Sequence, residues 1–176
     1  MKRLFLGVPL EESVRNQLHK KLHKIPGKKV PEQNWHFTLH FFGNIPEIEI
    51  PKLNELLKTV ALPNSFEVTI SELGAFPNTE VSKIVWMGIT SGAAAFTDLA
   101  LRFLTTLEEA GYPIDKRPFV PHITLSRLSR PQNLDPWIKN NAMPKTQAKI
   151  DKVVLYESII RNEKVEYVEL FFYNLD

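Results

Sequence analysis

Two stretches of the sequence, His36-Phe37-Thr38-Leu39 and His122-Ile123-Thr124-Leu125, repeat one pattern about half of the 176-residue chain apart. Each copy follows a segment with helical spacing and lies in an apolar and β-branched run that is typical of a strand. Alternate side chains of a strand point to the same side, so each copy places a histidine and a threonine on one face. The repeat therefore predicts two related lobes, each giving one strand to a shared cleft.

Two histidines that face each other across a small gap suit displacement at phosphorus. A neutral imidazole accepts a proton from water and an imidazolium gives one to the leaving oxygen, and a pKa near 6.5 allows both forms near neutrality. We therefore predict that His36 and His122 are catalytic and that the hydroxyls of Thr38 and Thr124 hold the phosphate oxygens. This chemistry requires neither a metal nor a covalent nucleophile. A duplicated pair of purely structural histidines is the alternative.

Two further side chains, Arg127 and His40, lie beside the motifs. A guanidinium suits phosphate recognition, but strict alternation places Arg127 opposite His122, so it reaches the cleft only if the strand bulges or ends near Ser126. His40 continues the face of His36 and is expected at the cleft rim or the surface. His36 and His40 would lie about 13 Å apart on a strand without a nearby acidic ligand, so no metal site is expected.

Basic residues gather after the first expected strand. His19 and His23 fall in a basic helical segment and are expected on a solvated face. The stretch formed by Lys20, Lys21, Lys24, Lys28 and Lys29 could hold an RNA backbone, or it could simply face solvent.

Hydrophobic periodicity and turn residues divide the chain into alternating strands and helices. Strands are expected over residues 2–9, 34–42, 66–76, 83–90, 119–128, 147–161 and 164–173, and helices over residues 11–24, 46–62 and 93–110. Asn162-Glu163 is a predicted hairpin turn. This order indicates an α+β or α/β fold with mostly antiparallel hairpins.

Composition excludes several classes of protein. The absence of cysteine excludes a disulfide scaffold, thiol catalysis and any Cys-ligated zinc or iron–sulfur site. The 22 Lys and Arg against 20 Asp and Glu are too balanced to indicate nucleic-acid binding without local clustering. No apolar run approaches the roughly 20 residues that span a bilayer. The N-terminus lacks a signal-peptide cleavage pattern, so a soluble, cytoplasmic protein is expected.

Taken together, the motifs resemble the two-histidine (2H) phosphoesterase superfamily. The resemblance is closest to its LigT-like branch, the RNA 2′,3′-cyclic phosphodiesterases also described as 2′-5′ RNA ligases. The matching stretches run in family order over nearly the whole chain: residues 3–6, 34–43, 85–88, 117–127 and 155–158. Phe42 stands where the family usually has leucine, which is a change in packing and leaves the chemistry undisturbed.

The resemblance implies an α+β fold with a bilobal, pseudo-two-fold arrangement of two antiparallel sheets around a central cleft, with the helices outside. It implies one domain, residues 1–176, made of two intertwined lobes that each carry one His-x-Thr motif. It also implies hydrolysis of an RNA terminal 2′,3′-cyclic phosphate to a 2′-phosphomonoester without metal or other cofactor, together with reverse 2′-5′ ligation.

Roles for single residues follow from motif position in that family. His122 would act on the attacking water, His36 would protonate the leaving 3′ oxygen, and Thr38, Thr124 and Arg127 would bind the phosphate. The pseudo-symmetry of the sequence leaves the two histidine roles interchangeable.

The expected partner is an RNA or oligonucleotide with a 2′,3′-cyclic phosphate end, bound by a monomer that does not contact a membrane. One alternative is a cyclic phosphodiesterase for small nucleotides, either ADP-ribose 1″,2″-cyclic phosphate or 2′-5′ linked oligonucleotides. Another is a non-catalytic RNA-binding module. The presence of both histidines and both threonines argues against the latter, because a decayed site would lose at least one of them.

Overall fold

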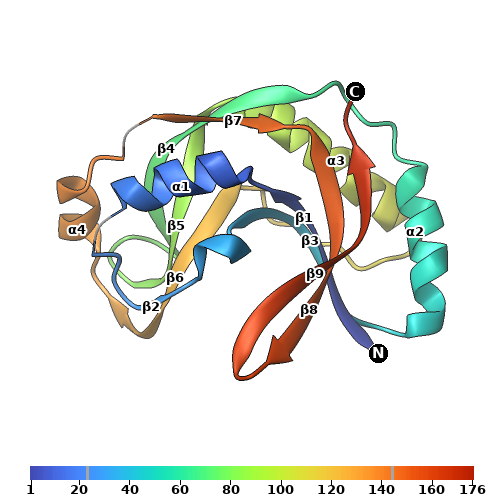
Figure 1. Ribbon diagram of the computed structural model, residues 1–176, viewed down its shortest axis with the longest axis horizontal. Helices are drawn as coiled ribbons and strands as arrows, with labels where there is room; N and C mark the ends of the chain where they lie inside the picture. Colours follow the sequence, from blue (N-terminus) through green and yellow to red (C-terminus); the bar gives the residue numbers. More distant parts are fainter. Residues whose placement is uncertain (23, 144) are drawn as a thin grey trace.

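Antiparallel strands dominate the computed structural model, which describes residues 1–22, 24–143 and 145–176 (Figure 1). One sheet runs in the order β7-β4-β5-β6-β3-β1-β8-β9, and β2 adds to β6. The strands are β1 Lys2–Pro9, β2 Lys28–Lys29, β3 His36–Ile45, β4 Phe66–Phe76, β5 Ser82–Ser91, β6 His122–Gln132, β7 Thr146–Ile150, β8 Lys152–Arg161 and β9 Lys164–Asn174. The helices are α1 Glu12–Lys21, α2 Ile50–Lys58, α3 Ala93–Glu109 and α4 Asp135–Asn140, with short 3₁₀ turns η1 Glu32–Asn34 and η2 Glu47–Glu49.

The sheet consists of two halves that meet at a single pair of residues. We call β3-β1-β8-β9 the first half-sheet and β7-β4-β5-β6 the second half-sheet. The central strands β3 and β6 are paired only at Phe37 and Ile123, whereas the neighbouring strands pair over many residues. The predicted α+β class and antiparallel pairing are confirmed, and the two expected sheets are joined at one point into a continuous path.

The main hydrophobic core occupies one side of this sheet, and a small cluster of Phe5, Val154 and Tyr156 lies apart from it. Phe37 and Ile123 point into the main core, and the ring of Phe37 packs on Phe96 of α3 with centroids 4.7 Å apart. The helix α1 buries Val14 and Leu18 in the same core. We call the opposite side of the sheet, which carries the neighbours of Phe37 and Ile123, the open face.

Several element boundaries differ from those expected. The strand expected over residues 147–161 is two strands, because the chain turns at Asp151 and passes from β7 of the second half-sheet to β8 of the first. The helix expected over 46–62 begins with the 3₁₀ turn η2 and ends at Lys58. The helix expected over 93–110 is confirmed as α3.

The hairpin predicted at Asn162-Glu163 is confirmed between β8 and β9. Both turn residues have positive φ, 50° and 62°, as the common two-residue turns of twisted hairpins require. Within the described part of the chain, no helix has the length and apolarity needed to cross a membrane.

Candidate active site

The four side chains predicted from the repeat surround the single pair that joins the half-sheets. Phe37 lies opposite Ile123, so continuing the antiparallel register by one residue sets His36 opposite Thr124 and Thr38 opposite His122. All four belong to the open face, because their neighbours Phe37 and Ile123 point into the core. The two histidines are diagonal neighbours, for which an antiparallel ladder gives a Cα separation of about 7–8 Å.

A β-bulge follows the motif in each half-sheet. In β3, Thr38 pairs with Gly7 and His40 with Leu6, so Leu39 has no partner on β1. In β6, Thr124 pairs with Trp86 and Ser126 with Val85, so Leu125 likewise has no partner on β5. A bulge of one residue reverses the alternation of the side chains that follow it. The two halves of the chain thus repeat the β-bulge as well as the His-x-Thr motif.

Because of the second bulge, Arg127 lies on the open face. Burial lowers the pKa of His122 and raises the pKa of Tyr167. The charge of Arg127 lowers the pKa of both groups. Arg127 therefore lies within electrostatic range of His122 on β6 and of Tyr167 on β9. A bulge near Ser126 was the condition for Arg127 to reach the cleft, and β6 contains that bulge.

The expected position of His40 is wrong. The bulge at Leu39 turns His40 toward the core side, where only 7% of its surface is exposed and its ring packs on Phe42 with centroids 4.7 Å apart. Burial lowers its pKa, and the charge of Asp115 opposes that shift. Its place on the open face is taken by Phe41, which stands in the first half-sheet where Arg127 stands in the second.

Both histidines are held in the same way by the chain two residues before them. Nδ1 of His36 donates to the carbonyl of Asn34 at 2.7 Å, and Nδ1 of His122 donates to the carbonyl of Val120 at 2.7 Å. A carbonyl only accepts, so Nδ1 carries the hydrogen in each ring and Nε2 is the proton acceptor of the neutral form. Nε2 of His36 is 3.0 Å from the hydroxyl of Thr38.

The surroundings favour the neutral form of both rings. Burial lowers the pKa of His36 to about 4; the hydrogen bond to the Asn34 carbonyl opposes this shift, and the nearby His122 adds to it. Burial also lowers the pKa of His122, opposed by its bond to Val120 and assisted by Arg127. A nearby positive charge thus opposes protonation of each ring: that of protonated His122 for His36, and that of Arg127 for His122. An anion between them would favour their protonation.

Aromatic side chains support each imidazole. The ring of His36 packs on Phe5 at 4.8 Å and edge-on against Tyr167 at 5.1 Å between centroids. The ring of His122 packs edge-on against Phe76 at 4.8 Å and lies 6.1 Å from Trp86. The aromatic rings around His36 come from β1 and β9, and those around His122 come from β4 and β5.

Three residues of the site were missed by the sequence analysis: Asn34, Phe41 and Tyr167. Asn34 is 8% exposed and its side-chain amide donates to the carbonyl of Val165 on β9 at 2.8 Å, so it ties the segment before His36 to the last hairpin. Phe41 is 62% exposed and its ring lies 5.7 Å from Phe5. Strict alternation from Thr38 would place Phe41 on the core side, so its position on the open face follows only from the bulge at Leu39.

The basic stretch after the first strand is divided by the fold. Lys20 and Lys21 lie in α1, whereas Lys28 and Lys29 form β2 on the edge of β6. His19 is exposed, as expected, and its Nδ1 is 2.7 Å from Glu32. The expectation for His23 concerns a residue outside those that the structure describes.

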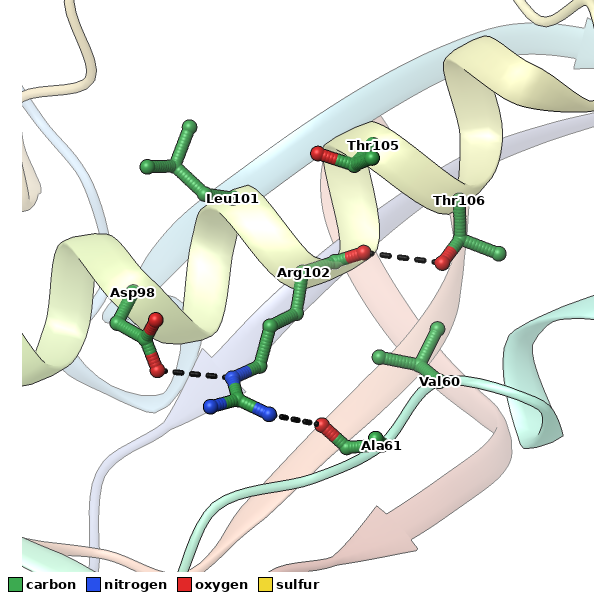
Figure 2. Close-up of a pocket in the computed structure, with 7 residues that line it drawn as sticks. All are labelled: Val60, Ala61, Asp98, Leu101, Arg102, Thr105 and Thr106. Carbon is green, nitrogen blue, oxygen red and sulfur yellow. Dashed lines mark hydrogen bonds and ion pairs between the residues drawn. The ribbon is translucent and has the colours of Figure 1, made fainter.

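A separate cavity of about 370 Å³ lies between α3 and the segment that follows α2 (Figure 2). Arg102 spans it, donating from Nε to Asp98 and from Nη1 to the carbonyl of Ala61. None of the site residues predicted from the sequence lines this cavity. Among residues 1–22, 24–143 and 145–176, no three acidic or histidine side chains are grouped as a metal site would need.

Comparison with known proteins gives a consistent result. The family model described as LigT like phosphoesterase matches residues 9–86 and 90–167. The RNA 2′,3′-cyclic phosphodiesterase of Aeropyrum pernix is 30% identical over 115 residues, 65% of this chain and 65% of that protein. The protein of the same name from Methanothermobacter thermautotrophicus is 31% identical over 139 residues, 76% of this chain and 74% of that protein.

The fold has solved counterparts. The crystal structure of E. coli LigT complexed with 3′-AMP aligns with a TM-score of 0.80 and 24% identity, over 99% of this chain and 98% of that one. The residues that the family model matches include both His-x-Thr motifs and strands of both half-sheets. The chain therefore belongs to the LigT-like family of the two-histidine phosphoesterases.

Proposed function

We propose that this protein hydrolyses the terminal 2′,3′-cyclic phosphate of RNA to a 2′-phosphomonoester, with His36 and His122 as the acid–base pair. The observation that carries the proposal is the arrangement of two imidazoles and two hydroxyls around the pair Phe37 and Ile123. The names of the Aeropyrum and Methanothermobacter relatives support the choice of substrate.

The reaction needs one proton acceptor and one proton donor on opposite sides of the phosphorus. Neutral His122 takes a proton from water as the water oxygen bonds to phosphorus, and protonated His36 gives a proton to the 3′ oxygen as its bond to phosphorus breaks. The 2′ oxygen keeps its bond, so a 2′-phosphomonoester and a free 3′ hydroxyl result. Each role contributes about 10²- to 10⁴-fold to the rate.

The lowered pKa values of His36 and His122 leave both rings mainly neutral in the free protein near pH 7. His36, with a pKa of about 4, is neutral near pH 7, so its role as acid depends on the charge of the bound phosphate. An anion between the rings offsets the burial and the repulsion that keep both rings neutral. Substrate binding therefore creates the singly protonated pair that the reaction uses.

Hydroxyl and guanidinium groups are suited to hold the phosphate during this exchange. Thr38 and Thr124 would donate to its non-bridging oxygens, and Arg127 on the open face would add positive charge where negative charge develops. Phe41, at the equivalent position of the first half-sheet, offers a flat exposed ring on which a nucleobase can stack. When a 5′ hydroxyl of RNA replaces water, the same groups would form a 2′-5′ linkage.

We also propose that the whole chain is one domain of two intertwined lobes that acts as a monomer. The chain crosses from the first to the second half-sheet after β3 and returns after β7, so the first half-sheet is built from both ends of the chain and the second from the segment between them. Both histidines come from the same chain, and the site therefore requires no second copy.

A single assay tests the proposed activity. The protein is incubated with 2′,3′-cyclic CMP, and separately with an RNA that ends in a cyclic phosphate, in buffer containing EDTA. We expect turnover of the RNA with 2′-phosphate as the product, identified by comparison with authentic 2′- and 3′-isomers. A 3′-phosphate product, or activity that EDTA removes and a divalent ion restores, would contradict the proposal.

Asn34 is expected to act as a positioning residue for His36. Replacing it with alanine removes the hydrogen bond to the carbonyl of Val165 and loosens the segment whose backbone holds Nδ1 of His36, at a cost of about 0.5–1.5 kcal/mol in the free energy of unfolding. We expect kcat to fall more than KM changes, and the pH dependence of kcat/KM to shift on its acidic side. Unchanged kcat in a destabilised Asn34→Ala variant would reduce Asn34 to a purely structural role.

A further inference from the structure

The segment from Pro26 to Val30 is fixed to the edge of β6 at the bulge of the second motif. The hydroxyl of Ser126 donates to the carbonyl of Pro26, and the amide of Val30 donates to the carbonyl of Leu125 at 2.8 Å. Between them, β2 pairs with β6. Gly27, with φ of 84°, lies so close that a Cβ there would be 2.7 Å from the carbonyl oxygen of Arg127. This part of the basic stretch is therefore built onto the site.

The pairing of β2 fixes the faces of its two lysines. Lys28 lies opposite Arg127 and Lys29 opposite Ser126. Residues directly opposite in an antiparallel pair point to the same side of a sheet. Lys28 therefore shares the open face with Arg127, whereas Lys29 shares the other side with Ser126, whose side chain is fully buried.

Lys28 and Arg127 form a pair of adjacent, uncompensated cations. Both side chains are exposed, and among the ion pairs of the described residues neither contacts a carboxylate. Like charges directly opposite each other on a sheet destabilise it, and an anion between them removes that repulsion. By contrast, Lys2 and Lys152 on the first half-sheet are each paired with a glutamate.

We propose that Lys28 binds the phosphodiester that precedes the cyclic phosphate, so that the preferred substrate is an RNA chain end and not a cyclic mononucleotide. This inference rests on the proposed function and extends it. The cyclic phosphate lies at the histidines, Arg127 lies beside it, and Lys28 continues the positive charge away from the site. An RNA end carries a second phosphate for Lys28, whereas a cyclic mononucleotide carries none.

The test compares two substrates, 2′,3′-cyclic CMP and a cytidine trinucleotide that ends in a 2′,3′-cyclic phosphate. The measured quantity is the ratio of their kcat/KM values. Lys28→Glu is expected to lower this ratio at least tenfold. Lys29→Glu makes the same charge change one residue away on the other side of β2, and it is expected to change the ratio by less than twofold. Thermal melting confirms that both variants fold.

Salt dependence gives an independent measurement. The plot of log kcat/KM against log salt should be steeper for the trinucleotide than for cyclic CMP, and Lys28→Ala should reduce the trinucleotide slope by about 0.7, the value for one phosphate contact in a single strand. Equal ratios in Lys28→Glu and wild type, or equal losses in Lys28→Glu and Lys29→Glu, would overturn the assignment of Lys28.

Arg3 provides a competing position, because it lies near Tyr167 on the first half-sheet. A fall in the ratio for Arg3→Glu without one for Lys28→Glu would place the preceding phosphate on the other side of the site. Failure of the wild-type protein to turn over either substrate would refute the proposed function itself. That outcome differs from turnover of both substrates at equal kcat/KM, which refutes only the inference about Lys28.

Discussion

Alanine in place of His36 or His122 is expected to lower kcat/KM for a 2′,3′-cyclic phosphate by about 10²- to 10⁴-fold, because each variant lacks one of the two proton transfers. Initial rates with 2′,3′-cyclic CMP or a cyclic-phosphate RNA measure the loss. His19→Ala is the matched control, since His19 is exposed in α1 and bonds to Glu32. A rate within twofold of wild type in either site variant would remove that histidine from the mechanism.

The half-buried position of His36 calls for a second variant. Alanine would leave a void beside Phe5 and Tyr167, so His36→Gln, which fills more of that space, separates loss of chemistry from loss of packing. A leaving-group experiment then distinguishes acid from base. A substrate whose 3′ oxygen is replaced by sulfur needs little protonation of its leaving group, so it should restore much of the rate of the variant that lacks the acid. We expect that restoration for His36→Gln and not for His122→Ala.

The pH dependence of kcat/KM is expected to be a bell with its maximum below pH 6.5. In the free protein the pair of histidines is active when it carries one proton. That proton is lost at the higher of the two pKa values, and both pKa values lie below 6.5. The rate should rise as the pH increases through about 4, where the doubly protonated pair loses its first proton. It should fall about tenfold per pH unit above the second value. Both limbs belong to the coupled pair and not to one residue alone.

Two comparisons sharpen this measurement. The profile of kcat reports the bound state, in which the phosphate anion raises both pKa values, so its descending limb should lie at higher pH than that of kcat/KM. Arg127→Gln removes a positive charge that acts on His122 and should also move the descending limb of kcat/KM upward. A flat profile between pH 5 and 8 would contradict paired acid–base histidines.

The sequence was sufficient to predict the residues that meet at the joint between the half-sheets. Period-two alternation alone sets a histidine and a threonine on one side of each strand, and the duplication places the two strands in equivalent positions. His36 and Thr38 therefore lie on the same face as His122 and Thr124 in the structure. Their roles as catalytic and phosphate-binding residues stay predictions until the assays above are done.

Alternation failed beyond the motifs because it does not include bulges. The unpaired residues Leu39 and Leu125 are apolar and buried, like any residue of a regular core-facing position, so composition gives no sign of the extra residue. The resemblance to a family in which an arginine follows the second motif was the only indication that Arg127 lies on the same face as His122. Nothing comparable pointed to the burial of His40.

The break at Asp151 had a signal that could have been used. Thr146, Ala148 and Ile150 are buried at alternate positions, but the next buried apolar residue is Val153, so the period slips by one residue at the break. Contacts such as that of Asn34 with Val165 could not be predicted, because they join segments from opposite ends of the chain.

Titration of the two imidazoles with a phosphomonoester tests most directly whether both act on one phosphorus. The ring nitrogens of His36 and His122 are followed by NMR while 2′-CMP, the expected product of cyclic CMP, is added. We predict that both Nε2 signals shift along one saturation curve with one ligand per chain, and that both pKa values rise in the complex. A response of only one ring, or two curves with different Kd values, would contradict a shared phosphate site.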